Sequence, residues 1–280
     1  MKFTFVKMQA LGNDFVVIDG INQAINLSAD NVRALADRHR GIGFDQLLLL
    51  ESSQSPEADF RYRIFNADGS EVAQCGNGAR CLARFIHDNR LSDKSEVKVQ
   101  TQAGLLRLRY LGLNQASVSL GVPLFKPQEI PHQLQGDGPV YQLTVGDGHE
   151  LEFLTVNVGN PHVLIRVDDV TKIDVPNIGA HITRHLAFPE GVNVGFVAIE
   201  SPERLSLRVY ERGVGETLAC GSGACAAAVL AQTQGWCRGD VTVAQQGGEL
   251  QVQWTGEGEE VWLSGPAEHV FNGEFIVEFL

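Results

Sequence analysis

Short runs of alternating apolar and polar residues dominate the first part of the chain. The segment FRYRIFN at 60–66 is the clearest case, because aromatic and aliphatic side chains alternate there with arginines. This period of two is typical of a half-buried strand. By the same pattern, or by a short apolar run, we predict further strands at 3–8, 15–19, 46–51, 96–101, 104–111 and 115–121.

Two helices are predicted between these strands. Ser28 is a suitable N-cap, and apolar residues follow it at helical spacing to about Arg40, where a pair of glycines ends the pattern. A second helix is predicted from about Ala79 to Asp88, because apolar residues recur there at i, i+3, i+4 and i+7. The first half is therefore predicted to be rich in strands, with two helices.

The second half repeats the order of the first. LGNDFVVI at 11–18 aligns with VGNPHVLI at 158–165 at an offset of 147, and Gln46 aligns with Asn193 at the same offset. A cysteine segment aligns at an offset of 145, with RIFNADGSEVAQCGNGAR at 63–80 and RVYERGVGETLACGSGAC at 208–225. Three landmarks in one order at nearly one spacing indicate an internal duplication and two similar domains.

The remaining elements of the second half fit this plan. Pro176 is predicted at the N1 position of a helix that corresponds to the first one, and an Ala-rich helix is predicted at 223–234. The Pro- and Gly-rich stretch 121–139 is predicted to link the two domains. Strands are predicted at 241–244, 249–254, 260–264 and 274–279.

Composition narrows the classes of function. The 280 residues include 22 Lys and Arg against 34 Asp and Glu, a net charge of -12, which argues against nucleic acid and anionic membranes as partners. The N-terminal residues do not have the pattern of a signal peptide, and no apolar run approaches the roughly 20 residues of a membrane span. With five cysteines and no export signal, we expect a cytoplasmic protein with reduced thiols.

Each cysteine segment combines features that suit a reactive thiol. The sequence C-G-[NS]-G places Cys75 or Cys220 directly before a helix, where unpaired N–H groups and the helix dipole favour anions. The same field is expected to lower the pKa of each thiol. The alternative is that both segments are glycine-bearing helix caps with buried cysteines. Two copies at equivalent positions favour the functional interpretation.

Two equivalent thiols suit the inversion of a carbon that carries a hydrogen. One group removes the proton from one face and the other returns a proton to the opposite face, which requires one thiolate and one thiol. This chemistry requires no cofactor and no metal. Helix N-termini directed at the substrate carboxylate would stabilise the developing carbanion.

Several runs of the sequence resemble diaminopimelate epimerases. They are MQALGNDF at 8–15, NADGSEVAQCGNGARC at 66–81, GNPH at 159–162 and YERGVGETLACGSGACAAA at 210–228, and the likeness continues to GPAEHV at 265–270. The resemblance implies a pyridoxal-phosphate-independent epimerase that interconverts LL- and meso-2,6-diaminopimelate, on the route to lysine and peptidoglycan precursors. It also implies an α+β fold of two pseudo-symmetric domains, each a mostly antiparallel, barrel-like sheet around a central helix.

The resemblance also gives a role to each matching residue. Cys75 and Cys220 would be the catalytic acid and base, assisted by His162 and Glu211. The implied substrate-binding residues are Asn13, Gln46, Asn66, Gly76, Asn77, Asn160, Asn193, Glu211, Arg212, Gly221 and Ser222. This polar set fits a small amino acid with two charged ends, because Arg212 can pair with a second carboxylate while the amides and Glu211 can receive ammonium groups.

Domain limits and assembly follow from the same resemblance. The domains would be residues 1–121 with 266–280, which carry Cys75, and residues 122–265, which carry Cys220. A homodimer is expected. Phe271 stands at a dimerisation position where relatives often carry tyrosine, so the ring is kept and the hydroxyl is lost.

Other functions explain less of the sequence. A proline or hydroxyproline racemase resembles this two-thiol plan, but the polar set favours a substrate with a second charged end. A redox protein that uses Cys75 and Cys220 would leave the polar set unexplained, and no C-x-x-C is present. A non-catalytic amino-acid-binding module would need neither thiol. A pyridoxal-phosphate enzyme is disfavoured, because none of the six lysines lies in a cysteine segment.

The remaining thiols, histidines and arginines are predicted to be structural. Cys81, Cys225 and Cys237 are expected to pack as small hydrophobic residues. His181 and His185 have the spacing of a zinc pair but lack the Glu of H-E-x-x-H, and they are predicted on the inward side of a helix. Arg80 and Arg84 are predicted to be solvated or to contact a second subunit.

Overall fold

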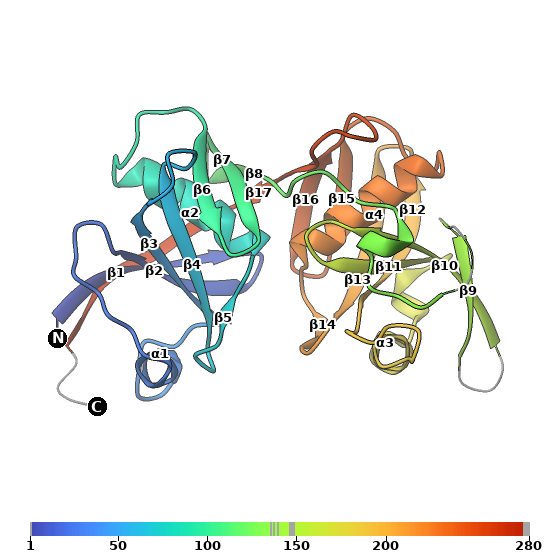
Figure 1. Cartoon of the computed structure of the whole chain (residues 1–280), viewed down its shortest axis with the longest axis horizontal. Helices are drawn as coiled ribbons and strands as arrows, with labels where there is room; N and C mark the ends of the chain where they lie inside the picture. The colour runs from blue at the N-terminus through green and yellow to red at the C-terminus, as the bar shows by residue number, and fades with distance from the viewer. Residues whose placement is uncertain (1, 135, 137, 139, 146–148, 277–280) are drawn as a thin grey trace. The chain divides into compact units, whose positions relative to one another are not determined.

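The computed structural model describes residues 2–134, 136, 138, 140–145 and 149–276. The chain divides into two compact units, the first made of Met1–Ser119 with Ser264–Leu280 and the second of Leu120–Leu263. The two predicted domain boundaries, after residues 121 and 265, each lie two residues further along the chain than these unit boundaries. Each unit is α+β and dominated by strands (Figure 1).

The sheet of unit 1 is mostly antiparallel. Its strands are β1 (Lys2–Ala10), β2 (Asn13–Asp19), β3 (Gln46–Ser52), β4 (Phe60–Asn66), β5 (Glu71–Val72), β6 (Val97–Thr101), β7 (Gly104–Gly112), β8 (Gln115–Ser119) and β18 (Glu268–Ile276). In spatial order β18, β1, β2, β3, β4, β6, β7 and β8 pair in turn, with β5 beside β4. The pairs β2–β3 and β4–β6 are parallel, and the others are antiparallel. Strand β17 (Trp262–Pro266) brings the chain back into this unit beside β8.

Two helices cover opposite faces of this sheet. Helix α1 (Ala29–Ala36) buries Val32 and Leu35 in one core cluster, against side chains of β1 to β4. Helix α2 (Gly76–Asp88) lies among β1, β2, β3, β7 and β8, and nine of its 13 residues are buried. The sheet therefore curves around α2 as a central helix, as the resemblance implies (Figure 1).

Unit 2 has the same plan. Its strands are β9 (Val140–Val145), β10 (His149–Asn157), β11 (Pro161–Arg166), β12 (Asn193–Ser201), β13 (Arg204–Glu211), β14 (Gly215–Thr217), β15 (Val241–Gln245) and β16 (Gly248–Gln253). Here too β11–β12 and β13–β15 are parallel, and the other pairs are antiparallel. Helix α3 (Val175–Thr183) covers one face, and the Ala-rich α4 (Gly221–Thr233) is the central helix.

Strand register agrees with the repeat. In unit 1 Phe15 is opposite Gln46, and in unit 2 His162 is opposite Asn193, the same pair moved by 147 residues. The two units therefore share connectivity as well as sequence landmarks. The short helices η1 (Pro127–Glu129) and η2 (Val170–Lys172) complete the described elements.

Some predicted limits were wrong. Helix α1 ends at Ala36, because the backbone of Asp37 is no longer helical and its carboxylate accepts the N–H groups of His39 and Arg40. Pro176 is the second residue of α3, with Asp174 as the N-cap. The predicted strand at 274–279 begins earlier, at Glu268, and its last three residues lie outside the described part.

The stretch 121–139 is not a free linker. Its described residues belong to unit 2, where Leu124 exchanges two backbone hydrogen bonds with Asn157 and Ile130 is fully buried. Its proline and glycine content indicated a loop. Apolar residues of that loop, such as Ile130, nevertheless pack into unit 2.

Candidate active site

The two cysteine segments adopt the same local structure. Cys75 is the N-cap of α2 and Cys220 the N-cap of α4, both with extended backbones. In each case the sulfur accepts the N–H of the glycine three residues later, at 3.4 Å for Gly78 and 3.4 Å for Gly223. The thiols therefore take the place of the Ser or Asp oxygen that usually caps a helix. Each N-terminus also offers backbone N–H groups to an anion.

Close packing explains the second glycine of each segment. A Cβ at position 78 would lie 2.5 Å from the hydroxyl oxygen of Tyr62, and a Cβ at position 223 would lie 2.9 Å from Cγ2 of Val209. Both distances are too short for a real side-chain contact. Glycine at these positions lets each helix begin directly against strand β4 or β13.

Polar residues of unit 2 form a connected network beside Cys220. Nε2 of His162 lies 3.0 Å from Oδ1 of Asn160 and 3.1 Å from Oγ of Ser222. The Ser222 hydroxyl in turn lies 3.6 Å from the Cys220 sulfur. Asn193 reaches the same imidazole nitrogen at 3.5 Å. Four predicted site residues are thus joined to one thiol by side-chain contacts.

His162 is neutral in this environment. Its side chain is buried, and burial together with the positive charge of Arg212 lowers the pKa of His162 to about 3. A neutral imidazole donates from one nitrogen and accepts at the other. His162 can therefore orient the Ser222 hydroxyl without adding a charge beside the thiol.

The pKa of the Cys220 thiol shifts in the direction opposite to our prediction. Burial raises this pKa well above its ordinary value, and the carboxylate of Glu211 raises it further. Contacts with Ser222 and the Gly223 N–H act in the lowering direction but are outweighed. The helix N-terminus is present as predicted. Desolvation, however, disfavours the charged form of a buried acid more than one N–H contact favours it.

Glu211 and Arg212 are held at the end of β13. The Glu211 carboxylate accepts the Thr217 hydroxyl at 2.5 Å, and the Arg212 backbone N–H donates to Oδ1 of Asn193 at 2.9 Å. The guanidinium of Arg212 is exposed and donates to the carbonyl of Glu190 at 2.8 Å. Arg212 thus presents a cation to solvent from a fixed backbone.

In unit 1 a direct contact joins two of the predicted residues, Gln46 and Asn66. Gln46, the first residue of β3, donates to Oδ1 of Asn66 at 2.9 Å, and Asn66 is the last residue of β4, before the Cys75 segment. Asn13 donates to Asp45 at 2.9 Å. Uncharged Asn66 occupies the position that Glu211 holds in unit 2, and Phe15 occupies that of His162.

Arg80 lies in an environment that the sequence did not predict. We predicted a solvated or subunit-contacting residue, but its side chain is fully buried. The guanidinium donates to Oδ1 of Asn77 at 3.1 Å and to the carbonyl of Pro266 at 3.3 Å. One turn later the half-buried Arg84 donates to the next carbonyl, that of Ala267, at 2.8 Å. Arg80 therefore belongs to the surroundings of the Cys75 helix.

Two further contacts near the thiols were missed. Gln245 holds the backbone of Cys220, accepting its N–H at 2.8 Å, and nothing in the local sequence indicated this. The second contact did leave a signal, because Arg63 and Glu71 recur as Arg208 and Glu216. They form equivalent ion pairs of 2.8 Å and 2.7 Å that hold β4 to β5 and β13 to β14.

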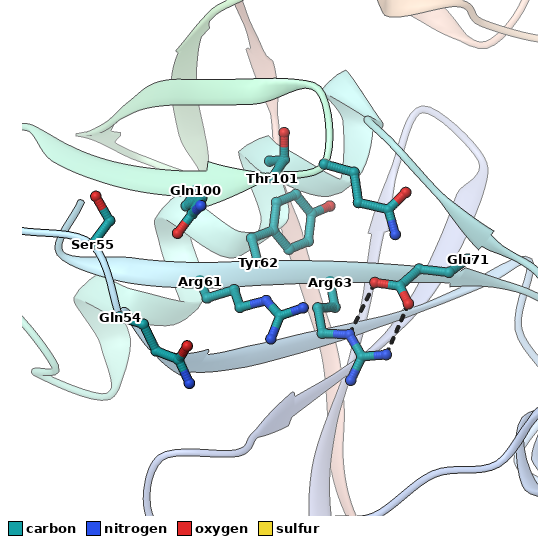
Figure 2. A pocket seen from close by; sticks show the side chains of 9 residues that line it. Gln54, Ser55, Arg61, Tyr62, Arg63, Glu71, Gln100 and Thr101 are labelled. Atoms are coloured by element: carbon teal, nitrogen blue, oxygen red, sulfur yellow. Dashed lines mark hydrogen bonds and ion pairs between the residues drawn. The ribbon is translucent and has the colours of Figure 1, made fainter. Parts of the chain in front are cut away.

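A hollow of about 550 Å³ on unit 1 lies beside the Arg63–Glu71 ion pair. Figure 2 shows Arg61, Arg63, Tyr62 and Glu71 among the nine residues that line it, and none of the nine is a predicted site residue. Both arginines already have carboxylate partners: Arg63 pairs with Glu71, drawn dashed, and Arg61 pairs with Glu51 at 3.6 Å. We therefore assign no binding role to it.

Other candidates have structural positions. Cys81, Cys225 and Cys237 are buried, as predicted. His181 is exposed near the end of α3, and His185 lies beyond that helix, so the predicted inward placement was wrong. Over the part of the chain that is described, His, Cys, Asp and Glu form no cluster of three that could hold a metal ion. Among the same residues, no helix is long and apolar enough to cross a membrane.

Phe271 lies on β18 with 46% of its surface exposed. It is opposite Lys7 on β1, and its ring meets that of Phe5 edge-on, with centroids 6.0 Å apart. The ring is therefore fixed against its own unit and presents one side outward.

Solved structures with little sequence similarity share this fold. A PhzF-family phenazine biosynthesis protein of Bacillus anthracis matches with a TM-score of 0.70 and 17% identity, over 99% of this chain and 100% of that one. A hydroxyproline epimerase of Agrobacterium vitis matches with a TM-score of 0.66 and 16% identity, over 98% and 92%. The chain thus has the two-domain fold of this group of epimerases, racemases and PhzF proteins.

Sequence similarity then identifies the family. The diaminopimelate epimerase profile matches residues 5–125 and 154–270. A diaminopimelate epimerase of Nitrosospira multiformis is 47% identical over 279 residues, 100% of both chains. One of Pseudomonas savastanoi pv. phaseolicola is 47% identical over 274 residues, 98% of this chain and 99% of that one. The chain belongs to the diaminopimelate epimerase family and is an isomerase of the epimerase type.

Proposed function

We propose that this protein interconverts LL- and meso-2,6-diaminopimelate by proton transfer between two thiols, without a cofactor. The observation that carries the proposal is the repeated N-cap, in which Cys75 and Cys220 each receive a glycine N–H at the start of a central helix. A single structural cysteine would not require this arrangement twice. The family membership supports the choice of substrate.

The reaction would proceed in two balanced proton transfers. A thiolate removes the α-proton, and the electron pair of the broken C–H bond is delocalised into the α-carboxylate. The opposite thiol then donates its proton to the other face of the carbon, so that the two sulfurs exchange protonation states. The backbones of Gly76–Asn77 and Gly221–Ser222 would hold the α-carboxylate and stabilise the developing negative charge.

Cys220 is proposed as the member that holds the proton in the free enzyme. The raised pKa of its thiol supports this, since burial and the Glu211 carboxylate both favour the neutral form. Cys75 would then be the first base. Glu211 and neutral His162 would assist by accepting from the thiol and by orienting Ser222 beside it.

The remaining polar residues would bind the far end of the substrate. Arg212 is exposed and charged, which suits the second carboxylate. The implied ligands of the amino groups and of the chain between them are Asn13, Gln46, Asn66, Asn160, Asn193 and Glu211.

Assembly and location remain predictions. A homodimer through the face that carries Phe271 is supported by the outward exposure of that ring on β18. The cytoplasmic location rests on the sequence alone.

The test is hydrogen exchange in heavy water. LL-diaminopimelate incubated with the purified protein should invert and gain deuterium at one α-carbon, with no added cofactor. Cys75→Ala and Cys220→Ala should each abolish inversion, while Cys237→Ala, which changes a buried thiol outside the proposed site, should retain it. Full activity in either of the first two variants would disprove the two-thiol mechanism. A preference for proline would instead assign the protein to the racemases that share its fold.

A further inference from the structure

Arg80 combines two properties that are rarely found together. It carries a permanent positive charge, and its side chain is fully buried. A buried charge is tolerated only where specific partners replace the water it has lost. Two of its partners are the side-chain oxygen of Asn77 and the backbone oxygen of Pro266, at 3.1 Å and 3.3 Å.

The contact with Asn77 fixes the orientation of that side chain. Because Oδ1 accepts from Arg80, the amide nitrogen with its two donors is turned away from the guanidinium. Asn77 is the second residue of α2, where backbone N–H groups have no partner within the helix. Arg80 therefore restrains the turn of backbone that follows Cys75.

Unit 2 achieves the same restraint with another residue. There the second helical residue is Ser222, and its hydroxyl lies 3.1 Å from buried His162. The position equivalent to Arg80 is Cys225, and the position equivalent to His162 is Phe15, so neither unit contains both restraints. Each central helix thus has one buried group that holds its second residue.

We propose that Arg80 is a positioning residue for epimerisation, holding Asn77 and the first turn of α2 as His162 holds Ser222 in unit 2. This role rests on the proposed function, because it assumes that the first turn of α2 binds the substrate carboxylate. Loss of the restraint leaves the thiol in place but lets the N–H groups at the carboxylate move.

Arg84 provides the matched control. It comes from the same helix and donates to the adjacent carbonyl of the same returning segment, but its side-chain partner is Asp88 rather than Asn77. If Arg80 acts only by attaching that segment to α2, Arg80→Gln and Arg84→Gln should have similar effects. If it acts through Asn77, only the first should impair the reaction.

Steady-state epimerisation separates these roles. We expect Arg80→Gln to lower kcat/KM on the order of 10²-fold, mostly through kcat, because a displaced anion site stabilises the carbanion poorly. Arg80→Lys, which keeps the charge but loses the forked arrangement of donors, should recover part of the loss, and Arg84→Gln should remain near the unchanged protein. In an Asn77→Ala background Arg80→Gln should have little further effect. Equal losses in the two Gln variants, or independent effects of Arg80→Gln and Asn77→Ala, would overturn the proposal.

A stability measurement, which needs no substrate, tests the contact between Arg80 and Asn77 independently of the proposed function. The free energy of unfolding of the two single variants and their double variant reports whether Arg80 and Asn77 are coupled in the folded protein. We expect coupling for this pair and none for Arg84 with Asn77, and absence of the first coupling would also overturn the proposal. If the unchanged protein showed no diaminopimelate exchange, the proposed function would fail while the coupling still measured the restraint.

Discussion

The two central helices begin alike but in different electrostatic environments. Cys75 and Cys220 have the same cap geometry and the same sulfur-to-glycine distance. Around Cys220 lie a carboxylate, a neutral imidazole and a hydroxyl, whereas the equivalent positions of unit 1 carry Asn66, Phe15 and Asn77. The two repeats share the backbone geometry that places a cysteine at the helix N-cap. The side chains around it diverged, and at Cys220 burial together with the Glu211 carboxylate raises the pKa of the thiol.

The first test of this difference between the two thiols removes the carboxylate of Glu211. Glu211→Gln is expected to lower kcat about 10²–10⁴-fold, the usual contribution of a positioned acid–base group. The pKa of Cys220 should fall toward its ordinary value, because one of the two main causes of its elevation is lost. Alkylation of each cysteine by iodoacetamide, followed by peptide mass spectrometry across pH, measures this shift.

The same protein contains an internal control for this variant. The alkylation profile of Cys75 should not change, since its unit is not altered. Glu190→Gln, a change of one exposed carboxylate in unit 2, should leave both profiles and the rate as they were. An unshifted Cys220 profile in Glu211→Gln would mean that burial alone sets the pKa of that thiol.

A second test replaces His162 with phenylalanine, the residue that unit 1 carries at the equivalent position, Phe15. The pKa of His162 is about 3 when folded and about 6.5 when unfolded, so the unfolded chain binds the extra proton between these values. The stability due to neutral His162 is therefore complete above about pH 6.5 and is lost as pH falls toward 3. Between about pH 7.5 and pH 4.5 this contributes on the order of 2–3 kcal/mol to the acid destabilisation.

Urea unfolding at those two pH values measures the effect. His162→Phe should be destabilised less by acid than the unchanged protein, whatever its absolute stability, because other titrating groups are common to both. His181→Phe, a change at an exposed histidine of the same unit, should keep the full pH dependence. Equal acid sensitivity in all three proteins would show that the folded state does not lower the pKa of His162.

Sequence was sufficient where the information was local or repeated. Alternation in FRYRIFN placed β4 at residues 60–66, and the offset of 147 paired Gln46 with Asn193 in equivalent registers. It was insufficient where a property depends on distant packing. Arg80 looked like a solvated helix residue, because its partner Pro266 lies 186 positions away. The direction of the Cys220 pKa was wrong because the helix N-terminus is visible in sequence, whereas burial of the thiol is a tertiary effect.

The third and smallest test concerns how closely each helix approaches its strand. Gly78→Ala would put a methyl group 2.5 Å from the Tyr62 oxygen, and Gly223→Ala would put one 2.9 Å from Val209. We expect each to destabilise its unit by about 1–3 kcal/mol, the usual cost of overpacking. This exceeds the gain of up to about 1 kcal/mol from replacing glycine in a helix.

The two clashes should differ in how they can be relieved. Tyr62 is buried, and its hydroxyl has no hydrogen-bond partner among the described residues, so Tyr62→Phe removes the clashing oxygen without breaking a bond. Thermal unfolding of Gly78→Ala with and without Tyr62→Phe should show recovery of most of the lost stability. Tyr62→Phe should not rescue Gly223→Ala, whose neighbour is an aliphatic carbon in the other unit. If rescue fails for Gly78→Ala, the approach of α2 to β4 is limited by the backbone or by Leu48, at 3.1 Å, rather than by the phenol.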